Sequence, residues 1–236
     1  MEKTPQYTFQ FTPDAIQLAG TARLAYIRKV YANFALGILA AIAGSLLAMN
    51  SSLVYFAAEH RIIALLIYLG AFFLASSSAD KPTRALPTMI LFTFISGVII
   101  SPLLFAIAHS YIPNTGVEMI YNALFLTGLV FAGLTTYVFV TKKDFSFLGA
   151  TLTVGLMVLL GAMFINMLFA HSTNLDFAIS IIGTLIFCGF ILVDTSLILA
   201  RANQIPPTMA ALRLYLDFLN LFLFILRILM GSKGRD

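Results

Sequence analysis

The sequence predicts an all-α integral membrane protein built as a bundle of seven transmembrane helices. Of its 236 residues, 60% are hydrophobic and only 10% are charged, whereas an average soluble domain is about 45–50% apolar and about 25% charged. The apolar residues form seven runs, and a helix needs about 20 mainly apolar residues to cross the hydrocarbon. Basic residues gather in alternate loops, as expected when Lys and Arg stay on one side of a membrane.

Composition also narrows the choice of partners. The single cysteine, Cys188, cannot form an internal disulfide, and the formal net charge of +4 arises from few residues. Both facts argue against a disulfide-linked scaffold and against an extended basic surface for nucleic acid. We therefore expect the chain to lie in a lipid bilayer and to have no nucleic acid partner.

The chain begins with a polar segment, residues 1–22, which contains two prolines. It lacks the basic residues followed directly by an apolar stretch that are typical of a signal peptide. We interpret it as a cytoplasmic N-terminal tail and see no cleavable signal peptide in it. A membrane domain over residues 23–230 follows, and residues 231–236 form a short C-terminal tail. The first span, residues 30–49, is uninterrupted.

The second predicted span, residues 53–77, is interrupted near its start by Glu59, His60 and Arg61, and its purely apolar part begins at Ile62. The next three spans are bounded by charges, proline or asparagine, whereas the last two contain charged residues. These five spans cover residues 85–108, 119–140, 145–169, 177–199 and 208–230.

Basic residues give the expected orientation, because Lys and Arg in short loops stay on the cytoplasmic side. With the N-terminus inside, ten basic residues fall on that side and one, Arg61, falls on the other. If the seventh span crosses the membrane, three further basic residues lie on the outer side: Arg227, Lys233 and Arg235. The alternative is that this segment enters the membrane and returns to the inner side. We favour a crossing. The ten inner residues are Lys3, Arg23, Arg28, Lys29, Lys81, Arg84, Lys142, Lys143, Arg201 and Arg213.

Small residues recur at a spacing that suits close helix packing. Ala40, Gly44 and Ala48 are each four residues apart, as are Gly128 and Ala132. This spacing lets helix backbones approach one another inside a membrane. Such pairs also arise by chance in helices rich in Ala and Gly, so both interpretations stay open.

Two of the ten acidic residues, Asp194 and Asp217, lie within predicted spans. An ionised carboxylate near the bilayer centre costs at least about 2.5–3.5 kcal/mol on insertion scales, so such a residue marks a functional site by default. Around Asp217, a polar stripe about 80° wide runs along one helix face. The alternative is a plain helix-surface ion pair between Arg213 and Asp217. The stripe consists of Arg213, Asp217, Asn220 and Arg227.

Asp194 and Asp217 enter the membrane from the same side, so they can meet across adjacent helices about one turn apart in depth. Desolvation and mutual repulsion disfavour ionisation of both carboxyls, and we expect the pair to share one proton near neutral pH. Loss of that proton adds repulsion, which parts the helices or offers oxygen ligands to a cation such as calcium. The pattern predicts a pH switch made without histidine, at which calcium binds only transiently.

The remaining polar residues predict neither catalysis nor a resident metal or cofactor. His60, His109 and His171 fall at loop edges without the spacing of metal ligands. The sequence shows no nucleophile with a base and an orienting group, so we expect no enzyme activity. We interpret Asn166 as a hydrogen-bonding residue between helices.

Five stretches of the sequence are distinctive when taken in order: AYIRKVY at 25–31, DKPTRA at 80–85, TKKDFSFLGA at 141–150, VDTSLIL at 193–199 and LYLDFLNLFLFILRIL at 214–229. Together they resemble the Bax inhibitor-1 (TMBIM) family of seven-span membrane proteins, including its bacterial branch. The resemblance covers essentially the whole chain from Arg23. It implies a bundle with a central seventh helix, and a pH-sensing aspartate pair that falls on Asp194 and Asp217.

The resemblance implies two different activities. Family members are described as pH-dependent calcium leaks, and some use an arginine at the end of the second helix as a latch. Serines stand at that point here, so Lys81 and Arg84 are the nearest candidates for a latch. A bacterial branch instead binds and restrains the AAA protease that degrades membrane proteins, through a cytoplasmic N-terminal tail.

We therefore expect a pH-sensitive conduit in a bacterial inner membrane that leaks calcium or a similar cation. Its gate is the pair Asp194 and Asp217, with Arg213 tuning the pair and Asn220 and Arg227 as polar neighbours. One alternative is a non-transporting modulator of the membrane-bound AAA protease, and another is a structural bundle whose acids serve only packing. The bacterial source rests on the resemblance alone.

Overall fold

The computed structural model describes residues 13–110, 115–170, 172–202 and 204–233. Within these ranges the chain is helical and has no strand. Seven stretches are long and apolar enough to cross a membrane, which confirms the all-α membrane bundle. The elements are α1 (Pro13–Met49), α2 (Leu53–Glu59), α3 (Arg61–Ser78), α4 (Ala85–Ser110), α5 (Thr115–Thr141), a 3₁₀ turn η1 (Ser146–Leu148), α6 (Gly149–Ile165), a π turn η2 (Asn166–Ala170), α7 (Thr173–Ala200) and α8 (Pro207–Lys233).

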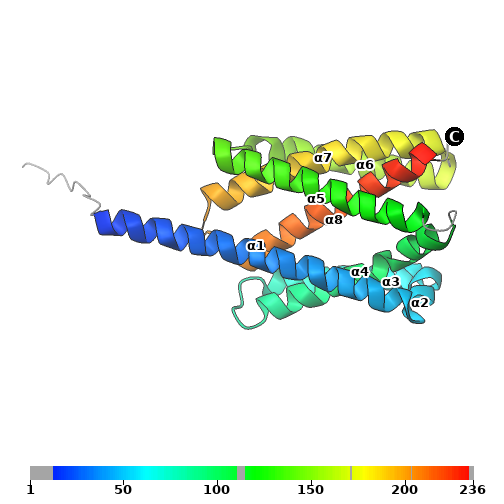
Figure 1. Cartoon of the computed structure of the whole chain (residues 1–236), viewed down its shortest axis with the longest axis horizontal. Coiled ribbons are helices and arrows are strands. Elements are labelled where there is room, and N and C mark those ends of the chain that lie inside the picture. The colour runs from blue at the N-terminus through cyan, green and yellow to red at the C-terminus, as the bar shows by residue number, and fades with distance from the viewer. Residues whose placement is uncertain (1–12, 111–114, 171, 203, 234–236) are drawn as a thin grey trace, which may run out of the picture.

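Successive long helices run in alternate directions along the bundle (Figure 1). The α3–α4, α5–α6 and α7–α8 connections lie at the end from which α1 starts, and the C-terminal end of α8 lies at the other (Figure 1). We call these the inner and outer ends. The seventh span, Pro207–Gly231, therefore runs from one end to the other as expected for a crossing. Lys81, Arg84, Lys142 and Lys143 all belong to inner connections.

The helices begin or end at other residues than the expected segments in two places. The second span is not one helix from residue 53: α2 stops at Glu59, His60 has non-helical dihedrals (φ −105°, ψ 51°), and a separate α3 begins at Arg61. The break falls at the three consecutive polar residues Glu59, His60 and Arg61, and the crossing part agrees with the apolar run from Ile62. At the other boundary, α1 starts at Pro13, inside the expected tail of residues 1–22. Proline suits a first helical turn, and residues 1–12 lie outside the described ranges.

The last helix, α8, is the centre of the bundle. Half of its most apolar window is buried, a larger share than in any other span described. It packs against α1, α4, α5 and α7, while α3 packs on α4 and α6 on α7. Stacked and edge-on rings of Phe34, Phe131 and Phe218, with centroids 4.8–5.8 Å apart, join α1, α5 and α8. The central seventh helix is thus confirmed.

The small residues of α1 form a close contact with α4. A Cβ atom added at Gly44 would collide with the backbone carbonyl of Phe94, and one added at Gly97 would collide with that of Ala41. Ala48 is fully buried. The packing interpretation is therefore right for this stripe. By contrast, a Cβ at Gly128 would meet open space, so Gly128 makes no such close contact with another helix.

Candidate functional site

A cavity of about 560 Å³, lined by both apolar and charged side chains, lies among α6, α7 and α8. Its position corresponds to the inner end of the bundle, because it includes the start of α6 and the end of α7. We call it the inner cavity. Its polar and charged lining residues are Ser146, Thr153, Asp194, Arg201, Arg213, Asp217 and Asn220.

The inner cavity brings the two intramembrane aspartates together. Asp194 lies on α7, six residues before Ala200, and Asp217 lies on α8, ten residues after Pro207. Their carboxyl groups are close enough to interact with one another. Asp217 is only 5% exposed, and its Oδ2 atom is buried with no hydrogen bond of ordinary geometry from the residues that the structure describes. A buried oxygen without a donor is costly for an ionised carboxylate.

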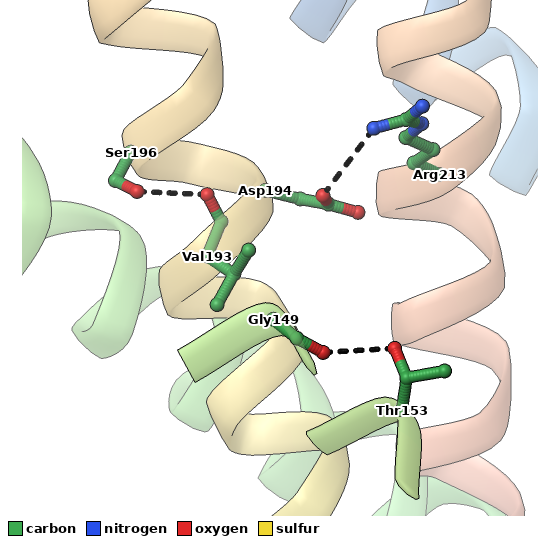
Figure 2. Close-up of polar contacts among 6 residues, drawn as sticks. All are labelled: Gly149, Thr153, Val193, Asp194, Ser196 and Arg213. Atoms are coloured by element: carbon green, nitrogen blue, oxygen red, sulfur yellow. Dashed lines mark hydrogen bonds and ion pairs between the residues drawn. The ribbon is translucent and has the colours of Figure 1, made fainter. Parts of the chain in front are cut away.

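Arg213 supplies positive charge at this pair. Its Nη1 atom lies 4.0 Å from Oδ1 of Asp194, and its side chain is 47% exposed. Figure 2 shows Asp194 extending from α7 toward α8, where Arg213 lies opposite. The ion pair of Arg213 in the described structure is thus with Asp194, and not with Asp217 four residues along its own helix. The guanidinium is thus about half exposed, and its positive charge acts on both carboxyls.

The other two residues of the stripe have separate places. Asn220 lines the inner cavity, but its Nδ2 atom donates to the carbonyl of Leu216 at 2.7 Å, within the helix. Arg227 lines a different cavity, at the outer end. The four residues of the stripe are thus divided between two cavities, with Arg227 at the outer one and the other three at the inner one.

The candidate latch residues are not part of this site. Lys81 and Arg84 are exposed in the turn between α3 and α4, and neither lines the inner cavity. Their backbone amides hold the turn, with Lys81 donating to Ser78 at 2.9 Å and Arg84 donating to Lys81 at 3.0 Å. A latch at these positions stays a prediction.

The wall formed by the start of α6 was missed by sequence reasoning. The hydroxyl of Ser196 on α7 accepts a hydrogen bond from the amide of Phe145 (3.2 Å) and donates to the carbonyl of Val193 (2.8 Å). In the same turn, Asp144 Oδ1 accepts from the amide of Ser146 at 2.8 Å. This backbone hydrogen bond lowers the pKa of Asp144. The signal was present in the D-F-S order, because an Asp side chain commonly bonds the amide two residues later.

The α6 wall also contributes a threonine to the inner cavity. The hydroxyl of Thr153 donates to the carbonyl of Gly149 at 2.8 Å, within α6 (Figure 2). A hydroxyl that donates in this way still has lone pairs to accept a second hydrogen bond. Thr153 therefore adds an acceptor to the wall that lies across from the aspartates.

An apolar layer lies further along the same seam of α7 and α8. The rings of Phe187 and Phe224 stack with centroids 5.8 Å apart, and Phe224 lies against Gly183, where an added Cβ would come within 2.6 Å of its ring. Phe187 lines the inner cavity, while Ser180 and Arg227 line the outer one. The layer therefore lies between the two cavities.

The inner cavity offers few ligands to a metal ion. In the part of the chain that the structure describes, no three His, Cys, Asp or Glu side chains come together as a metal site. Calcium takes 6–8 oxygen ligands, and Asp194 and Asp217 supply at most four. A passing ion here would keep much of its water, so transient calcium at the pair stays a prediction.

Comparisons with known proteins agree with this architecture. Residues 23–235 match the family model described as inhibitor of apoptosis-promoting Bax1. The chain is 38% identical over 178 residues to an uncharacterized membrane protein of Vibrio cholerae, covering 74% of this chain and 78% of that protein. It is 32% identical to Protein lifeguard 4 of Mus musculus, covering 88% and 85%. It is 31% identical to Bax inhibitor 1 of Schizosaccharomyces pombe, covering 97% and 84%. The chain is therefore an integral membrane protein of the Bax inhibitor-1 (TMBIM) family.

Proposed function

We propose that the protein is a pH-sensitive conduit that leaks calcium or a similar cation, with Asp194 and Asp217 as its gate. The observation that supports this best is the burial of Asp217 beside a second carboxyl in a cavity that also contains Arg213. Acids inside a membrane commonly mark ion pathways or proton relays. A bundle that needed only packing would have no reason to keep two costly acids in one cavity.

The balance of charge explains how protons would control the gate. When the aspartates share one proton, the pair has a charge of −1, which Arg213 neutralises. When that proton leaves, the cluster has a net negative charge, the carboxylates repel one another, and the cavity attracts a cation. We therefore expect the closed state at low pH and leakage as the pH rises.

The Phe187–Phe224 layer is the barrier in this proposal. A cation that entered the inner cavity would meet two stacked aromatic rings, which have no oxygen ligands to replace its water, and crossing such a layer is unfavourable. Repulsion at the aspartates would act on α7 and α8, the two helices whose rings form the layer. Separation of α7 and α8 would part the two rings and open the barrier without movement of the other helices.

The setting of the conduit follows from the same features. We infer a bacterial inner membrane with a cytoplasmic N-terminus, supported by the basic inner connections and by relatives in bacteria such as Vibrio cholerae. We also infer that the protein is not an enzyme, because the polar residues of the inner cavity do not combine a nucleophile, a base and an orienting group.

The alternative function is restraint of a membrane-bound AAA protease through the N-terminal segment. It needs neither aspartate. Deletion of residues 2–12 separates the two functions, because it leaves α1 from Pro13 complete. The conduit proposal expects unchanged ion flux after this deletion, whereas the protease alternative expects loss of restraint.

The direct test is calcium entry into liposomes that contain the purified protein, measured with a trapped calcium indicator at pH 6, 7 and 8. We expect entry above that of empty liposomes, increasing with pH. Protein that is folded, as shown by its helical circular dichroism, and yet gives no entry above empty liposomes at any pH would contradict the conduit.

A further inference from the structure

The largest of the cavities described lies at the outer end, away from the aspartate pair. It has a volume of about 830 Å³ and is bounded by the end of α6, the π turn, the start of α7 and the end of α8. We propose that this outer cavity binds the head group of a zwitterionic phospholipid, with the phosphate at Arg227 and the ammonium at Asp176.

Asp176 is held in place by a buried amide. Asn166 is only 3% exposed, and its Nδ2 atom donates to Oδ1 of Asp176 at 2.6 Å and to the carbonyl of Ser172 at 3.2 Å. Its Oδ1 atom accepts from the amide of Ser172 at 2.9 Å. Asn166 opens the π turn of residues 166–170, and π turns occur frequently at functional sites. Asp176 is exposed, and this hydrogen bond from Asn166 holds one of its carboxylate oxygens at the cavity wall.

Arg227 faces the same cavity from the opposite helix. Its guanidinium carbon lies 6.0 Å from the ring centroid of Phe224, within cation–π range. The two helices approach closely just beyond it, because a Cβ added at Gly231 would lie 2.8 Å from the ring of Phe177. Among the described residues no ion pair joins Arg227 and Asp176. The two opposite charges therefore line one cavity from the neighbouring helices α7 and α8 without a direct ion pair between them.

The depth of the site suits a lipid head group. Asp176 is three residues from the start of α7, and Arg227 is four residues from Gly231, where the seventh span ends. At 1.5 Å per residue, Asp176 lies about 4.5 Å from the start of its helix and Arg227 about 6 Å from the end of its span. Snorkelling basic side chains meet the interface at such depths.

The walls indicate a lipid in preference to a small soluble zwitterion. The side of the cavity formed by α6 and the π turn contains Leu160, Phe164 and Met167, which are 50–61% exposed in the isolated chain and so face the bilayer. Acyl chains would cover these side chains while the head group reaches the two charges. A free zwitterion would leave them uncovered.

The test is lipid binding measured by native mass spectrometry on the full chain in detergent. Dioleoyl phosphatidylethanolamine, which has both charges, is compared with dioleoyl phosphatidylglycerol, which has the phosphate alone. The site variants are Arg227→Gln and Asp176→Asn. Arg61→Gln and Glu118→Gln are matched controls, since both residues are exposed at the outer end and neither lines the cavity.

We expect Arg227→Gln to weaken binding of both lipids by about tenfold, the effect of losing one charged hydrogen-bond partner. Asp176→Asn should weaken phosphatidylethanolamine by a similar factor and leave phosphatidylglycerol unchanged or tighter. Retained phosphatidylglycerol binding also shows that the Asp176→Asn protein is folded. The control variants should match the wild type.

Three results would overturn the proposal. One is equal effects of Asp176→Asn on both lipids, which would mean that the carboxylate does not recognise the ammonium. Another is an equal loss of binding in the control variants, which would mean that the contact is a general attraction of the outer surface. The third is displacement of bound lipid by millimolar glycerophosphoethanolamine, which would identify a soluble zwitterion as the ligand.

Discussion

Arg213 sets the charge balance of the aspartate pair from a half-exposed position. It lies 4.0 Å from Asp194 on the neighbouring helix, so it favours the ionised form of that carboxyl. Water around the guanidinium screens this effect, and ion pairs of exposed groups are typically worth about 0.2–1 kcal/mol. We therefore propose that Arg213 adjusts the pH at which the gate opens and does not itself open it.

The first prediction concerns Arg213→Gln. Without the positive charge, ionisation of the aspartates becomes less favourable, so the pH at which calcium flux reaches half its maximum should rise, by about half a pH unit. Arg84→Gln is the matched control, because Arg84 is exposed at the inner end and does not line the inner cavity. An unchanged midpoint in Arg213→Gln, or an equal shift in the control, would contradict this role.

The residues of the two cavities differ in how well the sequence alone could predict their place in a site. Asp194 and Asp217 were found because an acid in an apolar run is costly wherever its helix packs. The partner of Arg213 was not determined by sequence, since the spacing along α8 suggested Asp217 and only the packing of α7 shows Asp194. Asp176 was missed as part of a site, because it lies at a helix start, where acids are ordinary.

The contact of α1 with α4 depends on glycines, and the second prediction tests it. Gly44→Ala places a methyl group against the backbone carbonyl of Phe94, which cannot move as a side chain can. We expect a loss of about 1–3 kcal/mol in the free energy of unfolding, typical of overpacking, seen as a lower thermal midpoint in detergent. Gly128→Ala is the control, and an equally large loss there would refute the packing argument.

The Phe187–Phe224 layer gives the third prediction. Phe224→Ala removes one of the stacked rings and opens the contact with Gly183. Calcium entry at pH 6, where the gate is expected to be closed, should rise several-fold. Phe125→Ala is a suitable control because Phe125 is 70% exposed and faces the lipid. If Phe224→Ala leaks no more than this control, the layer is not the barrier.

At the scale of elements, apolar length predicted all seven spans, because the bilayer thickness selects for it directly. The ends of helices were less predictable. His60 divides the predicted second span into α2 and α3, and α1 extends back to Pro13. Hydropathy does not report these boundaries, since they depend on local backbone conformation and on helix propensity outside the membrane.

The bundle as a whole has its two termini on opposite sides, which is the fourth prediction. The alternation of the helices places the start of α1 and the end of α8 at opposite ends (Figure 1). In a Cys188→Ala background, Lys3→Cys should react with a membrane-impermeant maleimide only after the cytoplasmic side is exposed, and Asp236→Cys should react from outside. Labelling of both from one side would mean that the seventh span does not cross.

The central claim is that protonation of the aspartate pair controls ion flux, and Asp217→Asn tests it most directly. The amide is nearly the same size as the carboxyl but cannot ionise, so the pair keeps the charge of its protonated state. The measurement is the ratio of calcium entry at pH 8 to that at pH 6 in liposomes. For the wild type we expect a ratio well above one. For Asp217→Asn we expect a ratio close to one, with low calcium entry at both pH values. A folded Asp217→Asn protein with the wild-type ratio would contradict the account.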